Sequence, residues 1–366
     1  MTHTALPKAP PFCPRSDCPF HKGDNKLWRY VRKGTFQSRR TGRSIQRYRC
    51  LQCGRFFSQR TFSAGYWLKR PDLLKHVAQR LVGCSGFRQI ARELGVSPET
   101  VARHASRLGR QAMLRHWKHW RGRTIAEPVA LDSFVSFEYS QYYPTHFHVL
   151  AGRESHFFYG FTESECRRSG RMTPGQRARR AELEARLGRP DPRSNEREVA
   201  ALLEVLTRDR GTLDLYTDED RAYPRALRRL RSVTVRHQTI SSRAARTPAN
   251  PLFAINLLDL LVRHSSANHK RETIAFSKRR KSAIERLWLF LLWRNYAKSF
   301  SEKKRDQTPA QNVGVTDRRW SLRELFRRRL FPDRIRLPER WKVHYLGAAA
   351  TRPLGASSIR QPRYAY

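Results

Sequence analysis

Two aspartates interrupt stretches that otherwise have the composition of buried β-strands. Asp132 lies in the middle of the apolar run Val129–Phe137, and Asp218 ends a shorter apolar run, residues 213–217. Carboxylates are rarely buried unless they are paired or bind a metal, and Mg²⁺ prefers carboxylate oxygens. Two strand-borne aspartates in a very basic chain therefore suggest a metal-dependent nuclease or strand-transfer site. The alternative is that both cap strand ends or pair with some of the many arginines.

The charge balance indicates which kind of partner the chain binds. It has 74 lysines and arginines against 31 acids, a formal net charge of +43 over 366 residues. A charge of this size calls for a polyanion, and double-stranded DNA is the obvious one. A membrane is not expected, because the longest apolar run, residues 287–293, is far too short to span a bilayer. Because the N-terminus has no continuous apolar signal core, we expect a cytoplasmic, nucleoid-associated protein.

Four of the six cysteines have the spacing of a structural zinc site. Cys13 and Cys18 form a loose pair with four residues between them, and Cys50 and Cys53 form a CxxC pair followed by glycine. Two such turns suit the tetrahedral coordination of Zn²⁺ by four thiolates. His21 could replace one thiolate, and the alternative is that these are unrelated reduced cysteines. Residues 28–34 and 45–50 between the pairs alternate like a ribbon hairpin. Residues 1–62 are thus predicted to be a zinc-ribbon module that binds DNA through its phosphates.

A helix-turn-helix is predicted next, within residues 63–122. Gly95 supplies the turn between two amphipathic segments, and Ser97 followed by Pro98 has the pattern of a helix start. The apolar periodicity of the second helix leaves its other face for the major groove of DNA. The residues expected on that outward face are Thr100, Arg103, His104 and Arg107. The alternative is an ordinary helical hairpin with solvated arginines.

The order of the remaining elements predicts a mixed α/β catalytic domain over residues 123–300. Three strands joined by short connections are followed by a helix, a strand, a helix, a strand and a longer helix. This is the order of the ribonuclease-H-like fold, in which the first and fourth strands are neighbours and carry acids that face each other. Residues 166–195, polar and rich in arginine, proline and glycine, are expected to be an insertion loop. The predicted fold class is thus α+β multidomain: a zinc ribbon and helix-turn-helix before a ribonuclease-H-like domain.

These motifs together resemble a known family. The chain is similar to the transposases of the IS-one type of small bacterial insertion sequence over roughly residues 10–300. The carriers of the resemblance are the Cys50-Leu-Gln-Cys53 ribbon, the helix-turn-helix, Leu131-Asp-Ser-Phe, Tyr216-Thr-Asp-Glu-Asp-Arg-Ala-Tyr223 and Arg271-Glu-Thr-Ile-Ala-Phe-Ser-Lys278. The resemblance implies a DDE-type strand transferase that binds the ends of its own element and uses Mg²⁺ or Mn²⁺ for DNA cleavage and strand transfer during transposition, a form of DNA recombination.

The third acid is the position at which this sequence departs from the family. The family's glutamate falls on Asn256 here, and the nearest acid on the same helix is Asp259, one turn on. We expect Asp259 or Asn256, rather than Glu272 or Glu285, to complete a magnesium site with Asp132 and Asp218. An amide can bind Mg²⁺ through its carbonyl oxygen. The alternative for Asp259 is an intrahelical pair with Arg263, four residues later.

The remaining expectations concern DNA contacts and assembly. Lys270 and Arg271 could hold DNA near the scissile phosphate, or form a basic loop that caps a helix. Residues 301–366 are predicted to be a basic, partly disordered C-terminal tail, and the stretch after Tyr345 to be disordered. A homodimer or higher oligomer on DNA is expected. Two other functions stay open: a non-catalytic DNA-binding regulator with a decayed catalytic domain, and a structure-specific nuclease or resolvase of the same fold.

Overall fold

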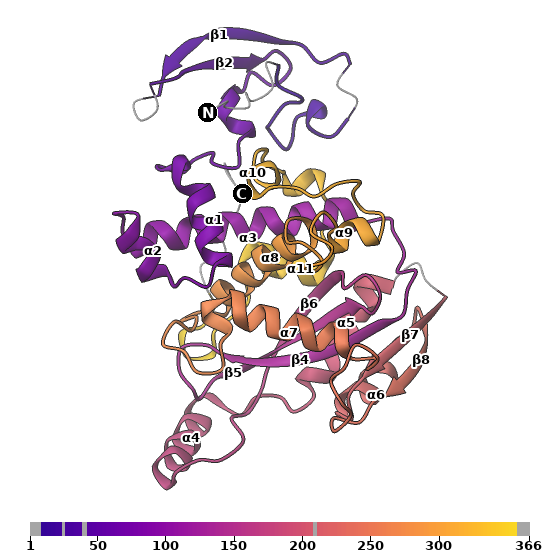
Figure 1. Ribbon diagram of the computed structural model, residues 1–366. Helices are drawn as coiled ribbons and strands as arrows, with labels where there is room; N and C mark the ends of the chain where they lie inside the picture. Colours follow the sequence, from indigo (N-terminus) through magenta and orange to yellow (C-terminus); the bar gives the residue numbers. More distant parts are fainter. Residues whose placement is uncertain (1–8, 24–25, 39–41, 208–210, 357–366) are drawn as a thin grey trace.

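The computed structural model describes residues 9–23, 26–38, 42–207 and 211–356, and shows a mixed α+β protein with two sheets (Figure 1). At the N-terminal end, a small antiparallel sheet has the order β1-β2-β3. Its strands are β1 (Tyr30–Gln37), β2 (Ser44–Cys50) and β3 (Phe56–Ser58). A separate cluster of aromatic and cysteine side chains forms its core, which Phe331 from the C-terminal part of the chain joins. The predicted ribbon strands are thereby confirmed.

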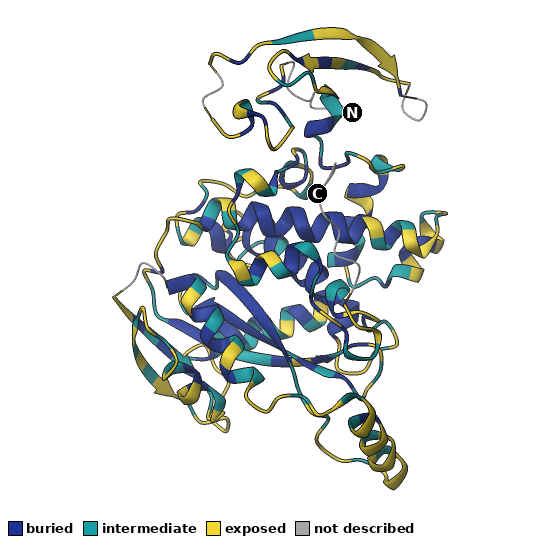
Figure 2. Cartoon of the chain, turned by 180° about the vertical axis from the view of Figure 1, so that it is seen from behind, coloured by how far each residue is buried: buried dark blue, intermediate teal, exposed yellow. Residues whose placement is uncertain are grey.

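Three helices follow the ribbon: α1 (Leu74–Val82), α2 (Phe87–Glu93) and α3 (Pro98–Trp120). The predicted helix start is confirmed, since the Ser97 hydroxyl accepts a hydrogen bond from the Thr100 amide and Pro98 is the first helical residue. Gly95 makes the turn with φ +60°, a conformation that favours glycine. These helices share one continuous hydrophobic core with the large sheet. Helix α3 is therefore packed into the body of the molecule along most of its length, whereas α2 lies at its margin (Figures 1 and 2).

The junction between α3 and α8 (Arg280–Tyr296) is very close. A Cβ added at Gly109 would lie 2.3 Å from the backbone oxygen of Glu285, so only glycine fits there. One turn earlier on α3, the Ser106 hydroxyl donates to the Glu285 carboxylate at 2.5 Å. Helices pack this closely only where one of them lacks a side chain. The two helices are thus held in a fixed relation.

The large sheet has five strands in the order β6-β5-β4-β7-β8. The strands are β4 (Val129–Phe137), β5 (Pro144–Gly152), β6 (Phe158–Glu165), β7 (Thr212–Thr217) and β8 (Thr234–Thr239). The first three are antiparallel, whereas β4–β7 and β7–β8 are parallel. The first and fourth strands of the predicted domain are therefore neighbours, as expected. The helices around the sheet include α5 (Ser194–Thr207), α6 (Ala222–Leu227) and α7 (Phe253–Ser265).

Helix α4 (Pro174–Leu187) corrects one expectation, because it lies within the 166–195 stretch that was predicted to be a loop. It projects from the body, and most of its side chains are exposed (Figures 1 and 2). The Thr173 hydroxyl and the Gln176 side chain cap its first turn reciprocally. With Leu183 as its one buried residue, it has too little apolar surface to show a helical period.

The C-terminal region also differs from the expected partly disordered tail. Residues 301–356 contain α9 (Pro309–Asn312), α10 (Leu322–Leu325) and α11 (Glu339–Leu346), which pack on the body of the molecule (Figure 1). Trp341 of α11 is completely buried and contacts Trp288 of α8. The expected disorder after Tyr345 is not seen up to residue 356, and residues 357–366 lie outside the described part of the chain.

Helix side chains cover the outer edge of β6. The Trp341 indole donates to the Phe161 carbonyl, the Arg340 guanidinium to the Glu163 carbonyl, and Asn295 bonds both backbone groups of Phe158. An edge strand otherwise presents unpaired backbone groups to other chains. These contacts close that edge.

Candidate functional site

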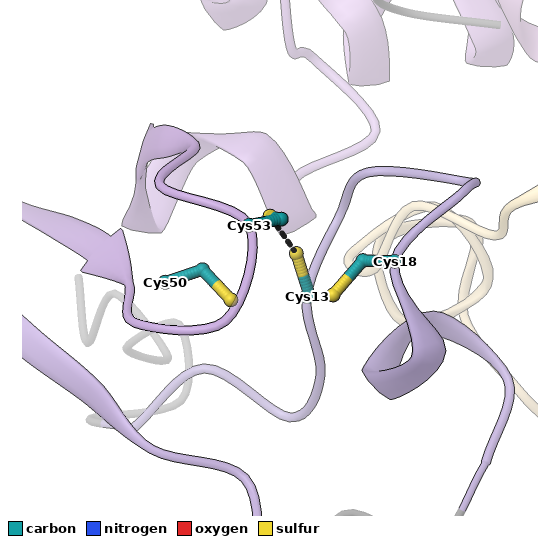
Figure 3. A group of neighbouring side chains, drawn as sticks. All are labelled: Cys13, Cys18, Cys50 and Cys53. Carbon is teal, nitrogen blue, oxygen red and sulfur yellow. Dashed lines mark hydrogen bonds between the residues drawn. The ribbon is translucent and has the colours of Figure 1, made fainter.

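The four predicted cysteine ligands come together in the ribbon (Figure 3). The sulfur atoms of Cys13, Cys18, Cys50 and Cys53 all lie within 4.8 Å of one another. Tetrahedral zinc with Zn–S bonds of about 2.3 Å needs sulfur atoms just under about 4 Å apart. The group is compact enough to hold one zinc ion in a closed structural site.

Neighbouring groups favour the thiolate form of one ligand, Cys50, whereas burial raises the pKa of Cys13 and Cys18. The Trp28 indole donates to the Cys50 sulfur at 3.2 Å. Burial opposes ionisation of this thiol, but the bonds from Trp28 and from the backbone lower the pKa of Cys50 to about 7. His21, considered as an alternative ligand, is not a member of the group: its Nδ1 bonds the Cys13 carbonyl at 2.8 Å. It supports the first knuckle instead.

Asp132 lies on β4, and Asp218 directly follows the neighbouring strand β7 at a matching position. Ala130 of β4 pairs in parallel with Tyr216 of β7, and each aspartate lies two residues further along its strand. Residues two apart point to the same face of a sheet, and adjacent strands are about 4.8 Å apart. Asp218 is just past the end of β7, where its carboxylate accepts the Asp220 amide at 3.0 Å. Asp220 itself is exposed and bonds the Ala222 amide.

The third acid comes from α7, which packs against β4 and β5. Asp259 accepts a hydrogen bond from Arg263 Nε at 3.0 Å, which is the intrahelical pair expected as the alternative role of Asp259. Its other oxygen, Oδ1, is buried without a hydrogen-bond partner. Asn256 lies one turn earlier and is half-buried. Within the described residues, no hydrogen bond joins its side chain to the three carboxylates.

The electrostatics of the site link these three acids. The pKa of Asp132 is raised to about 7, mainly by burial and further by the negative charges of Asp218 and Asp259. The Ser133 amide, which donates to its carboxylate at 2.6 Å, and the charge of Arg246 only partly offset these effects. Burial and the nearby charges of Asp132 and Asp218 also raise the pKa of the Tyr223 hydroxyl. Negative charge is therefore concentrated at this point of a basic protein.

The donor set suits hard divalent cations. The described carboxylates do not form a group with all oxygens within 4.8 Å of one another, in contrast to the cysteines. The unpartnered Asp259 oxygen and the disfavoured charge on Asp132 would both be satisfied by bound cations.

Two of the four residues predicted to face DNA on α3 are buried, so their predicted orientation is wrong. Both ring nitrogens of His104 bond backbone carbonyls, those of Thr100 and Arg70, at 2.7 and 2.6 Å. The Arg107 guanidinium donates to the carbonyls of Ala64 and Tyr66. Both side chains hold the linker from the ribbon against α3. Arg103 is exposed and Thr100 is partly exposed, as expected.

The other candidate residues separate in the same way. Lys270 and Arg271 are exposed in the segment after α7. Glu285 is buried on α8 against Ser106, so it is not a ligand of the carboxylate site. Glu272 is exposed. The charge of Arg246 acts on Asp132, and the acids act in turn on Tyr223; neither residue was predicted as part of the site. The sequence signal that could have identified Tyr223 is the Ala222-Tyr223 pair, which follows Asp220 after one residue.

Comparisons with known proteins add little to this description. No protein-family model matches the chain, and no curated protein matches it. Among solved structures, one similar chain comes from a cryo-electron-microscopy structure of a simian T-cell lymphotropic virus intasome in complex with the PP2A regulatory subunit B56 gamma. It is 14% identical, the match covers 72% of this chain and 76% of that chain, and the TM-score is 0.24. At that score the likeness carries no argument.

Within the described residues, no helix is long and apolar enough to cross a membrane.

Proposed function

We propose that the chain is a DNA transposase that cleaves and joins DNA with the help of divalent metal ions. The observation that carries the proposal is the meeting of three acids from separate elements: Asp132 on β4, Asp218 after β7 and Asp259 on α7. The strand order, with three antiparallel strands and two parallel ones beyond the first, is the order expected of a ribonuclease-H-like domain. The motifs that resemble IS-one-type transposases favour this class over other enzymes of that fold.

The residues of the site have distinct roles under this proposal. Asp132, Asp218 and Asp259 would hold two Mg²⁺ or Mn²⁺ ions, with Asn256 as the other candidate ligand. Bound ions of this kind activate a water or a 3′-hydroxyl and stabilise the leaving 3′-oxygen. Because the pKa of Asp132 is about 7, its carboxyl must lose a proton to become a ligand, so metal affinity should rise with pH up to about 8. Arg246 lies close enough to influence Asp132 and would attract the DNA phosphates.

The DNA-binding parts fit the same function. The zinc group would stabilise a ribbon that has abundant basic residues, and Arg103 on α3 would contact the major groove of the element ends. Lys270 and Arg271 would contact the DNA near the scissile phosphate. We further propose that the protein works as a homodimer or higher oligomer in the bacterial cytoplasm.

One observation favours a second function, a DNA-binding regulator without catalysis. The pairing of Asp259 with Arg263, together with Asn256 at the family's glutamate position, would be the result of decay in the third ligand. Retention of Asp132 and Asp218 on neighbouring strands favours the enzyme. A structure-specific nuclease or resolvase would share the site but would not need terminal repeats.

Metal-dependent cleavage of element-end DNA and of a supercoiled plasmid tests the proposal. We expect nicking and joining with Mg²⁺ or Mn²⁺, and loss of both in Asp132→Ala and Asp218→Ala while end binding persists. Asp214→Ala is the matched control, since Asp214 is on β7 but its carboxylate pairs with Arg236 at 2.6 Å. Full activity in the first two variants would refute the proposed site. End binding without any cleavage by the wild-type protein would favour the regulator.

A further inference from the structure

A large cleft lies between the helix-turn-helix and the segment that leads into α8. Its volume is about 1270 Å³, more than the roughly 300–1000 Å³ of ordinary small-molecule pockets. Helix α2 and the first turns of α3 form one wall, and residues 274–286 form the other. The walls meet where a Cβ at Gly86 would lie 3.5 Å from the Cβ of Ala275. The cleft therefore lies between the predicted helix-turn-helix and the segment that joins α7 to α8.

Both walls of the cleft are basic. Arg88, Arg92 and Arg103 line one wall, and Lys278 and Arg279 the other. These five side chains are exposed, and within the described residues no carboxylate lies within 4.0 Å of any of them. Of the acids that line the cleft, Glu285 is buried and bonded to Ser106, and Glu99 is exposed at the start of α3. Such a cleft attracts a polyanion.

The cleft also presents aromatic rings beside the positive charges. Phe87 on α2 lies under the guanidinium of Arg286, which is 5.0 Å from the ring centroid. On the opposite wall, the Lys278 ammonium lies 3.9 Å from the centroid of Phe276, which rests against Phe137. Positive charge interleaved with aromatic faces is the combination that binds single-stranded nucleic acid, with phosphates on the cations and bases on the rings.

An exposed apolar side chain marks the mouth of the cleft. Ile274 is 99% exposed, although it lies in a segment that is itself well anchored. Asn268 Nδ2 donates to the Ser277 hydroxyl, and Ser277 forms a parallel bridge with Glu138 just beyond β4. A single exposed apolar residue needs no explanation by itself. Beside a basic cleft, however, an anchored isoleucine has the character of the wedges that separate base steps.

The position of the cleft relative to the three acids is fixed. Glu138 follows Asp132 by six residues along an extended strand, a distance of about 20 Å. The other wall cannot move independently, because α3 is packed without a gap on α8 at Gly109. DNA that enters the cleft would thus lie at a constant distance from the carboxylates.

We propose that this cleft binds an unpaired segment of DNA, a single strand of a few nucleotides, with Ile274 at the point where the duplex opens. A volume of about 1270 Å³ is that of a cube with an edge of about 11 Å, which is narrower than a duplex whose major groove alone is about 12 Å wide, so a single strand fits inside the cleft and a duplex does not. That the bound strand flanks the cleaved end of the element rests on the proposed function. The preference for single-stranded DNA rests only on the cleft.

The test compares two full-length double variants that each lose two positive charges. Arg88→Ala with Arg279→Ala removes one cation from each wall, and Arg177→Ala with Arg186→Ala removes two exposed cations from α4. Binding of a fluorescent single-stranded oligodeoxynucleotide and of its duplex is measured by anisotropy over a range of salt. The cleft variant should bind the single strand about 10-fold more weakly, and the salt slope should fall by about 1.4 for two lost phosphate contacts. The α4 variant should bind like the wild type.

Unchanged single-strand affinity in the cleft variant overturns the inference, as does an equal loss for single strand and duplex.

Opening of the duplex is followed with 2-aminopurine at the junction of a duplex and a single-stranded extension. The fluorescence should rise when the wild type binds and opens the duplex. Ile274→Ala should lose this rise, whereas Leu354→Ala, a change at another exposed apolar residue, should keep it. An undiminished signal in Ile274→Ala refutes the wedge.

The outcome is separable from that of the proposed function. Asp214→Ala, which removes a carboxylate outside both the cleft and the three-acid site, should bind the single strand like the wild type. If the wild type cleaves DNA but the cleft variant keeps its single-strand affinity, the inference fails and the proposed function stands. If the wild type never cleaves but the cleft variant loses single-strand affinity, the proposed function fails and the cleft stands.

Discussion

Replacement of Asp132 by asparagine should stabilise the metal-free protein at pH 8. The pKa of this carboxyl is raised from the ordinary 3.8 to about 7 by burial and by Asp218 and Asp259. Between these two values the folded state binds more protons than the unfolded state, so the free energy of unfolding falls as pH rises. The destabilisation is complete above about pH 7. Asparagine has a similar shape, can still accept the Ser133 amide, and carries no charge.

The size of the effect follows from the shift. The rise of roughly three units in the pKa of Asp132 corresponds to about 4 kcal/mol of destabilisation at pH 8, and this value is an upper bound. Asp218 and Asp259 are both half-buried, so water screens part of the repulsion. We therefore expect Asp132→Asn to raise the free energy of unfolding by about 2 kcal/mol at pH 8, and by clearly less at pH 5.

Urea unfolding, followed by tryptophan fluorescence, measures this difference. Buffers should be depleted of divalent ions by resin and contain no chelator, so that zinc stays on the cysteines. Asp214→Asn is the control, because it removes an ion pair with Arg236 and should not stabilise. Addition of Mn²⁺ should then stabilise the wild type more than Asp132→Asn, because a bound ion favours only the state that holds it.

A different result would refute the reasoning directly. If Asp132→Asn is no more stable than the wild type at pH 8, or if its advantage is the same at pH 5, the charge on Asp132 is not disfavoured in the fold. If Mn²⁺ affects both proteins equally, the three carboxylates do not form a cation site.

Two further predictions concern the framework. Cys53→Ser should lower the zinc content from one ion to less than one per chain and should weaken duplex binding. Zinc is measured by plasma mass spectrometry, and an unchanged zinc content would exclude the four-cysteine site. Gly109→Ala should lower the free energy of unfolding by about 2 kcal/mol, because the methyl group of the new alanine would overlap the Glu285 backbone. The change is measured by thermal unfolding, and stability equal to the wild type would contradict the close packing of α3 on α8.

The sequence predicted the strands of the large sheet well, because runs such as Val129–Phe137 are short and rich in β-branched and aromatic residues, which favours a strand over a buried helix. It also predicted the helix start at Ser97 and Pro98, where the signal is local. The neighbouring positions of Asp132 and Asp218 followed from the element order and are confirmed by the pairing of β4 with β7.

The errors concern features that depend on distant partners. His104 and Arg107 have polar side chains, and only the linker carbonyls that they bond explain why they are buried. Helix α11 was missed because its buried residues pack on strands and helices far earlier in the chain; Trp341, for example, contacts Trp288 and donates to the Phe161 carbonyl. The apolar and aromatic spacing at Trp341 and Tyr345 was a signal, but it was short and lay among prolines and arginines.

The covered edge of β6 has a consequence for synthesis of the protein. The strand is complete at Glu165, but two of the groups that bond its outer carbonyls, on Arg340 and Trp341, are translated about 175 residues later. At about 5–20 residues per second, the open edge persists for roughly ten seconds or longer on the ribosome. Nascent chains on one messenger could pair edge to edge during that interval. The yield of native protein should therefore depend on translation speed and chaperone supply.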